Sequence, residues 1–228
     1  MKPRLKVFMI LLAVTLLVRC KKDDSNTLVG IHDLSFLERL IRLGYDTNGD
    51  GNISIAEARA VKSLNINGFN ISDLSGIESF SNLEMLNCGS NNFSELNLTG
   101  NPALKILVIA GGNLAKLDIS GAPSLTVLEC GENKLTNLDV SKNTLLDSLE
   151  CGNNRIEQLS LTNNLILRTV NCNSNNLKSI DLSKNAALTF LDCSNNKLMT
   201  LDISNNTTLT YLVCSQNILG TLDLSKNT

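Results

Sequence analysis

The chain has 228 residues, which is enough for one or two ordinary domains with a sizeable core. Its 20 basic and 22 acidic residues give a net charge of −2, and four of the basic residues lie in the first 20 positions, which hold no acid. Without those positions the net charge becomes −6, which argues against nucleic-acid binding, because phosphates require clustered lysine and arginine. Trp is absent, whereas Leu and Asn are abundant, a bias that is typical of repeats.

Residues 1–20 have the pattern of a secretory signal sequence. A basic head, made of Lys2, Arg4 and Lys6, precedes an apolar run over residues 7–18. This run is shorter than the roughly 20 residues that a bilayer-spanning helix needs. A buried helix of a folded domain is the alternative, but a basic head at the start of the chain favours export.

The end of this signal segment resembles the lipobox of bacterial lipoproteins. It is Leu-Val-Arg-Cys over residues 17–20, and Arg19 departs from the small residue that is usual there. The resemblance implies that Cys20 is lipidated and becomes the first residue of the mature chain. The charged tail at 21–24 resembles the signal that directs Bacteroidetes lipoproteins to the outer face of the cell. We therefore expect an outer-membrane lipoprotein at the cell surface, with residues 21–30 as a tether to the membrane.

Residues 46–57 match the ligand spacing of an EF-hand calcium loop. Gly51 permits the sharp turn that the loop makes, and Ile53 is the apolar residue that pins it. The six expected ligands are Asp46, Asn48, Asp50, Asn52 through its carbonyl, Ser54 through a water, and Glu57 through both carboxylate oxygens. Hard oxygen ligands with three carboxylates suit one Ca²⁺ ion, whose flexible shell takes six to eight of them.

Both flanks of the loop are predicted to be helical. Apolar residues at helical spacing precede it over residues 34–43, and Ser54-x-x-Glu57 is a capping box for a helix that runs to about Lys62. A metal-free turn is the alternative interpretation, since Asp, Asn and Gly favour turns in any case. The segment 31–62 resembles EF-hand and dockerin loops. Because it is single, we expect a structural clip rather than a switch.

The rest of the chain is a tandem repeat of 21 residues. An irregular first unit occupies residues 63–82, and seven units fill residues 83–228, the last of them incomplete. Their consensus is L-x-x-L-x-C-x-x-N-x-L-x-x-L-D-L-S-x-N-x-x. Because no unit can bury its own apolar side, the units must stack into a solenoid with a shared core.

Each unit is expected to form one coil with two extended sides. The Leu-x-Cys segment predicts a short strand whose alternate residues point inward. The Asn three positions later should turn inward and satisfy backbone groups of neighbouring coils. These residues are Asn91, Asn133, Asn154, Asn175, Asn196 and Asn217. A similar Leu-x-Leu-x-x-Asn pattern follows ten residues later, so we predict strands on both sides of every coil.

The repeat resembles the 21-residue class of bacterial leucine-rich repeats known as IRREKO. The resemblance covers residues 83–228 and implies a mainly β, gently curved leucine-rich-repeat solenoid with parallel sheets. It identifies no ligand. The predicted fold is therefore such a solenoid, preceded by a small helix–loop–helix cap.

Six of the seven cysteines occupy one position of the repeat. They are Cys88, Cys130, Cys151, Cys172, Cys193 and Cys214, and the second unit has Ile109 in that place. A position that alternates Cys with Ile predicts apolar packing and free, unreactive thiols rather than disulfides. No His or second Cys in each coil completes a tetrahedral metal site.

The outward positions of the Leu-x-Cys strands form the candidate ligand surface. An apolar stretch is followed by an acidic strip and two aromatic residues: Met85, Ile106, Val108, Val127, Glu129, Glu150, Phe190, Asp192 and Tyr211. Exposed apolar patches often mark interaction sites. Cross-strand packing, which favours such residues on any β surface, is the alternative explanation.

The sequence shows no catalytic constellation, and its only histidine, His32, lies before the calcium segment, where we expect a solvated residue rather than a catalyst. We therefore predict a cell-surface, calcium-binding scaffold, rather than an enzyme, with a protein or glycan partner. The alternative is a structural spacer that presents a missing C-terminal domain. This alternative arises because the last unit stops in mid-repeat without the polar cap that terminal units need.

Overall fold

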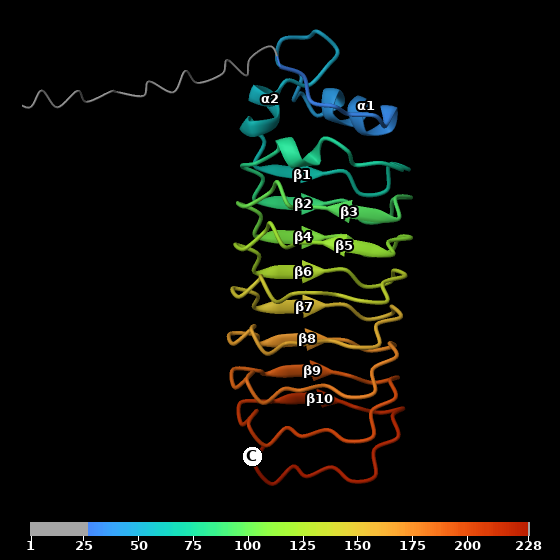
Figure 1. Cartoon of the computed structure of the whole chain (residues 1–228), viewed down its shortest axis with the longest axis vertical. Helices are drawn as coiled ribbons and strands as arrows, with labels where there is room; N and C mark the ends of the chain where they lie inside the picture. The colour runs from blue at the N-terminus through green and yellow to red at the C-terminus, as the bar shows by residue number, and fades with distance from the viewer. Residues whose placement is uncertain (1–26, 228) are drawn as a thin grey trace, which may run out of the picture.

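The computed structural model describes residues 27–227, which form a helical cap followed by a single stack of coils (Figure 1). The cap contains α1 (Leu34–Arg42) and α2 (Ile55–Ala60). The signal segment 1–20, its Cys20 and the first part of the tether lie outside the described residues. No described helix combines the length and the apolar character that crossing a bilayer would require.

One long side of the stack is a parallel sheet of eight strands, whose order along the sheet follows the chain. Each strand has three residues, and its middle Leu or Val lies in the core, fully buried in every strand before the last. Register partners are 21 residues apart in the regular units, as in Leu86 with Leu107. The strands are β1 (Ser63–Asn65), β2 (Met85–Asn87), β4 (Ile106–Val108), β6 (Val127–Glu129), β7 (Ser148–Glu150), β8 (Thr169–Asn171), β9 (Phe190–Asp192) and β10 (Tyr211–Val213).

The opposite side carries far fewer strands than the sequence predicts. Its only strands among the described residues are β3 (Glu95–Asn97) and β5 (Lys116–Asp118), which pair in parallel. Further along, one isolated bridge joins Ser160 to Asp181. The prediction of strands on both sides of every coil is therefore wrong for the later units.

Close approach of two coils at a glycine accompanies the second sheet. Gly121 lies so close to the preceding coil that an added Cβ would come within 2.3 Å of the Thr99 backbone. The next unit has Lys142 at this position, and the units after it have Asn163 and Lys184. Gly121 therefore permits the close approach of the two coils that carry β3 and β5, whereas the later units have a side chain at this position.

The inward-turned asparagines form the predicted ladder. The Nδ2 atom of Asn175 donates to the carbonyls of Cys151, Cys172 and Asn173 at 3.0–3.1 Å, and its Oδ1 accepts from the amide of Ile156 at 2.9 Å. The two amide hydrogens of this side chain are shared among three carbonyls, and its oxygen accepts one bond, so each ladder residue joins its own coil to the preceding one.

A second asparagine ladder runs along the other side of the coils. The Nδ2 atom of Asn185 donates to the carbonyls of Leu161 at 3.1 Å and Asn164 at 2.9 Å. Its buried Oδ1 has no hydrogen-bond partner, and the same is true of its equivalents Asn143 and Asn206. Each residue of this ladder is therefore only half satisfied.

The cysteines confirm the prediction of free core thiols. All six repeat cysteines are free, and only Cys214 is partly exposed. Burial raises the pKa of the Cys130 thiol to about 12. Burial also raises the pKa of Cys193 to about 12, with smaller contributions from neighbouring acidic groups. Since the thiolate is the reactive form, these thiols are unreactive in the folded chain.

Candidate functional site

The nine residues of the predicted ligand surface all lie on one face of the eight-stranded sheet. Each is the first or third residue of its strand, and the middle residue points into the core. Met85 and Tyr211 are 37% and 55% exposed, and the other seven are partly exposed. The sequence alternation therefore identified this face, and its role in binding stays a prediction.

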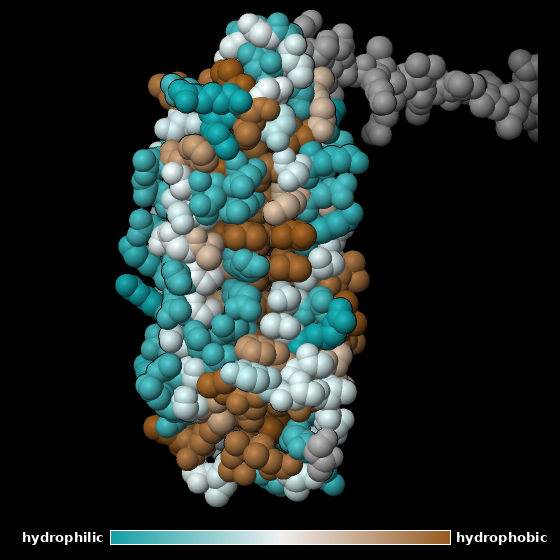
Figure 2. Space-filling view, turned by 180° about the vertical axis from the view of Figure 1, so that it is seen from behind, coloured by the Kyte–Doolittle hydropathy of each residue, from teal (hydrophilic) through white to brown (hydrophobic). Residues whose placement is uncertain are grey.

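Apolar side chains gather on β2, β4 and β6 of this face. Ile106 pairs in register with Met85 on one side and with Val127 on the other, and Val108 lies two residues along the same strand. In Figure 2 a brown band crosses the molecule at the level of β4 and β6, and hydrophilic surface separates it from a second brown area at the lower end of the stack. The band is a continuous apolar surface over three strands.

Two aromatic rings lie toward the last strands of the sheet. Phe190 and Tyr211 are register partners, and their rings stack with centroids 4.9 Å apart and planes inclined by 4°. The two rings bury their stacked faces against each other, whereas the ring of Tyr211, on the last strand, stays exposed. The face thus has an apolar band on β2, β4 and β6 and an aromatic pair on β9 and β10, with β7 and β8 between them.

A hollow of about 390 Å³ lies between these two apolar areas. Its base includes Gly131 and Gly152, which have no side chains to fill it. Three carboxylates, those of Glu129, Glu132 and Glu150, line it together with asparagines, and no basic residue does. Glu129 and Glu150 are direct register partners, an arrangement of like charges that destabilises a sheet.

The electrostatics of the hollow reflect this crowding. Burial, followed by the nearby carboxylates of Glu129 and Asp192, raises the pKa of Glu150, although a hydrogen bond from Asn171 opposes the change. No ion pair within residues 27–227 involves Glu129, Glu132 or Glu150. The carboxylates of the hollow are therefore not neutralised by any residue that the structure describes.

Some acidic residues elsewhere in the coils do form ion pairs. Glu84 pairs with Lys105 at 2.7 Å. Asp147 forms a bidentate contact with Arg168, with nitrogen–oxygen distances of 2.6 and 2.9 Å. A larger hollow of about 500 Å³ beside β3 and β5 also contains an ion pair, between Glu95 and Lys116. The hollow on the sheet face thus differs from this larger one in that its lining carboxylates form no ion pair within residues 27–227.

One residue of the hollow was missed by the sequence reasoning. Glu132 has a left-handed backbone with φ of 55°, and its equivalents in neighbouring units, Gly111 and Asn153, share this conformation. Gly and Asn adopt it readily, whereas for Glu it is uncommon. The signal was available in the sequence as a column of Ser, Gly, Asn and Gln at 21-residue spacing, in which Glu132 is the only charged residue.

The loop 46–57 has the backbone shape that its sequence predicts. Gly49 and Gly51 have positive φ values of 74° and 80°. The carboxylate of Asp46 accepts hydrogen bonds from the amides of Gly49, Asp50 and Gly51 at 2.8–3.2 Å. Ile53 is 1% exposed and anchors the loop in the core.

Glu57 is held by the loop itself. Its Oε2 accepts from the amide and hydroxyl of Ser54, and its Oε1 from the amide and hydroxyl of Thr47, at 2.7–2.9 Å. Burial acts to raise the pKa of Glu57, but these hydrogen bonds outweigh it and lower the pKa to about 2. Across residues 27–227 no three acidic, His or Cys side chains converge as a metal site requires, and this includes the carboxylates of the loop.

The start of the described chain is bonded to this loop. The amide of Val29 donates to the carbonyl of Ile53, and the amide of Ile55 donates to the carbonyl of Thr27, both at 2.8 Å. The side chains of Val29 and Ile31 also lie over Gly76 of the first coil. Residues 27–30, which the sequence predicts to belong to the tether, are therefore part of the folded cap, so the predicted end of the tether at residue 30 is wrong.

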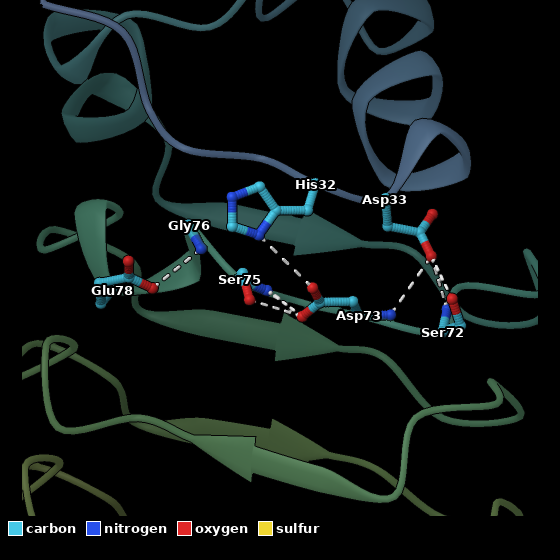
Figure 3. A network of polar contacts seen from close by, with 7 residues as sticks. All are labelled: His32, Asp33, Ser72, Asp73, Ser75, Gly76 and Glu78. Carbon is cyan, nitrogen blue, oxygen red and sulfur yellow. Dashed lines mark hydrogen bonds and ion pairs between the residues drawn. The ribbon is translucent and has the colours of Figure 1, made fainter.

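His32 and Asp33 join the cap to the first coil through polar contacts (Figure 3). Asp33 caps α1 by accepting from the amide of Phe36, and it also accepts from the amide and hydroxyl of Ser72 at 2.8 and 2.7 Å. The Nδ1 atom of His32 lies 3.8 Å from Asp73. The hydroxyl of Ser75 donates to Asp73 rather than to His32, so these residues form a structural junction and not a nucleophile–base pair.

No protein-family model matches the sequence, and no curated protein has significant similarity to it. Solved structures do resemble it. The functional domain of InlJ from Listeria monocytogenes, described as including a cysteine ladder, is 33% identical with a TM-score of 0.54. That match covers 77% of this chain and 49% of the InlJ chain, so this chain spans about half of its relative.

Two further structures share the fold. Internalin C2 from Listeria monocytogenes is 18% identical, with a TM-score of 0.76 over 86% of this chain and 90% of its own. The LRR ectodomain of the plant receptor kinase GASSHO1/SCHENGEN3 from Arabidopsis thaliana was solved in complex with CASPARIAN STRIP INTEGRITY FACTOR 2. It is 22% identical, with a TM-score of 0.59 over 64% of this chain and 20% of its own. The fold is therefore that of a leucine-rich-repeat solenoid.

Proposed function

We propose that this leucine-rich-repeat solenoid is an interaction scaffold that binds a protein partner on the face of its eight-stranded sheet. The observation that carries the proposal is the composition of that face. It combines an apolar band, a stacked aromatic pair and carboxylates without ion-pair partners among the described residues, whereas Glu84 and Asp147 beside it are paired. The fold alone requires none of these features.

The comparisons support a protein partner in general terms. The plant ectodomain shares the fold and was solved with a bound protein factor. A rigid stack of coils holds its outward side chains in fixed register, which suits recognition without a change of shape. A glycan is the other partner class that the sequence left open, and the test below separates the two.

The binding face can be tested by site-specific photo-crosslinking in intact cells. A benzoylphenylalanine placed at Val108 should form adducts that protease degrades, because this position lies within the apolar band. The same probe at Lys178, which is exposed on the opposite side of the coils, is the matched control. Replacing Ile106 and Val127 by serine should abolish the Val108 adducts.

Equal labelling at both positions, or none at either, would favour the structural spacer instead. Adducts that resist protease but are removed by glycosidase would identify a glycan as the ligand. Either outcome would contradict the proposal, since it names the partner as a protein.

We also propose that a lipid on Cys20 attaches the chain to the outer face of the outer membrane. The basic head, the apolar run of 12 residues and the Leu-Val-Arg-Cys segment support it. A fatty-acid probe should label the wild-type chain and not the Cys20→Ala variant. An unlabelled wild type would leave an ordinary secretory signal.

For the loop 46–57 we propose one structural Ca²⁺ ion. The backbone shape fits, since both loop glycines have the required positive φ and Ile53 is anchored in the core. Asp46, Asn48, Asp50, the carbonyl of Asn52, Ser54 through a water, and Glu57 would provide its oxygens. Glu57 would then have to leave its bonds to Thr47, so the ion competes with hydrogen bonds that already hold the loop.

Calcium titration of the full-length chain in detergent should therefore show one site per molecule by calorimetry. Asp46→Ala and Glu57→Gln should each abolish it, because each removes a charged oxygen ligand. Glu38→Gln, on the exposed side of α1, is the control and should leave binding unchanged. Binding that survives both loop substitutions would contradict the assignment.

A further inference from the structure

The acidic hollow on the sheet face indicates what kind of partner the scaffold takes. We infer that it seats lysine or arginine side chains of an extended, basic segment of a protein, an inference that rests on the proposed function. The hollow is lined by the carboxylates of Glu129, Glu132 and Glu150 and by no basic residue. A docked segment would supply the positive charge that residues 27–227 do not place there.

The acidic residues are not needed by the fold. Other strands of the same sheet have Asn87, Val108 or Val213 at the position of Glu129 and Glu150, and they pair equally well. Register partners of like charge cost stability, and so does the partial burial that raises the pKa of Glu150. Charges kept at a cost in one place of a repeat point to a role in binding.

The spread of the charges favours side chains over a metal ion. The carboxylates follow the sheet from Glu129 on β6 to Asp192 on β9, three strand spacings apart. At about 4.8 Å for each strand this is about 14 Å, a span that several separate cations would match.

An extended peptide that runs along the sheet can place several cations over this span. Its alternate side chains face the same way at about 6.6 Å intervals, so three basic residues at alternate positions cover about 13 Å. From β4 to β10 the sheet extends about 24 Å, which is about seven extended residues. Apolar side chains at the two ends of such a segment would meet Ile106 and Val127 at one end and Tyr211 at the other.

Three labelled peptides of nine residues test this on the full-length chain in a neutral detergent. The first has lysine at three alternate positions between a terminal leucine and a terminal tyrosine. In the second and third, norleucine or glutamate replaces the lysines. We expect fluorescence anisotropy to show the lysine peptide binding most tightly, more weakly as salt is raised, and the glutamate peptide not binding.

The double variant Glu129→Gln, Glu150→Gln should weaken binding of the lysine peptide about tenfold or more. Glutamine keeps the size of both side chains and removes their mutual repulsion, so the variant should keep the circular dichroism of the wild type. The control is Glu157→Gln, an exposed acid on the other side of the coils, which should change the Kd by less than about twofold.

Equal binding of the lysine and glutamate peptides, or indifference to the double variant, would overturn the inference. If the norleucine peptide binds best and is sensitive only to Ile106→Ser and Val127→Ser, the sheet face binds proteins but not through charge. If no peptide binds, the inference is also wrong, and crosslinking at Val108 still decides the proposed function separately.

Discussion

Replacing Asn175 by leucine is expected to lower the free energy of unfolding by about 3 kcal/mol or more. The substitution leaves the buried amide of Ile156 without a partner. The carbonyls of Cys151, Cys172 and Asn173 each lose one hydrogen bond but keep another, from Asn154, Asn196 and the amide of Asn153. An unpaired buried amide costs about 1–3 kcal/mol, and each hydrogen bond that is lost costs about 0.5–1.5 kcal/mol. Urea denaturation followed by circular dichroism measures the change.

Substitutions at two other asparagines provide the comparison for this prediction. Asn185→Leu should cost clearly less, because that side chain makes two hydrogen bonds and its Oδ1 has no partner to lose. Asn205 is exposed, and its replacement by leucine should change stability by no more than about 0.5 kcal/mol. If Asn175→Leu and Asn205→Leu had similar effects, the ladder would not hold the coils together.

Cys172→Asp should be the most damaging single change in the cysteine column. Cys172 is fully buried between the equivalent cysteines of two adjacent coils, so a carboxylate there would be desolvated without a cationic partner. We expect a loss of about 4 kcal/mol or more, with a broadened unfolding transition because neighbouring coils depend on one another.

Cys172→Val is the matched control and should cost less than about 1.5 kcal/mol, as near-isosteric core substitutions do. The wild-type thiols should resist alkylation in the folded chain and react fully after denaturation without reductant. A disulfide between successive units, or equal effects of Val and Asp, would contradict the packing role of the column.

Much of the fold could be predicted from the sequence because a solenoid is a linear stack of similar units. Each coil contacts mainly its neighbours, so a pattern that recurs every 21 residues determines the register of the sheet. The alternation around Leu128 and Leu149 placed those residues in the core and Glu129 and Glu150 on the outer face. The inward asparagines and the free cysteines were predictable for the same reason.

The sequence also located the acidic loop but not the contacts of its side chains. Ligand spacing identifies oxygen atoms that could surround an ion, whereas hydrogen bonding decides where each one lies. The carboxylate of Glu57 accepts hydrogen bonds from both Ser54 and Thr47, and that of Asp46 accepts hydrogen bonds from three backbone amides. Which of these bonds an ion would displace is a property of the folded loop.

Only the tertiary structure decided the spacing of the coils and the pairing of their charges. Gly121 permits two coils to approach closely where β3 and β5 pair, and the next unit has Lys142 at this position and no such strand. The folded structure decides which charged side chains come within ion-pair distance. Asp147 pairs with Arg168, whereas Glu150 forms no ion pair with any described residue. The sequence alone determined the periodic fold and its outward face, because these depend on local alternation. The unneutralised hollow depends on distances between coils, which no local pattern contains.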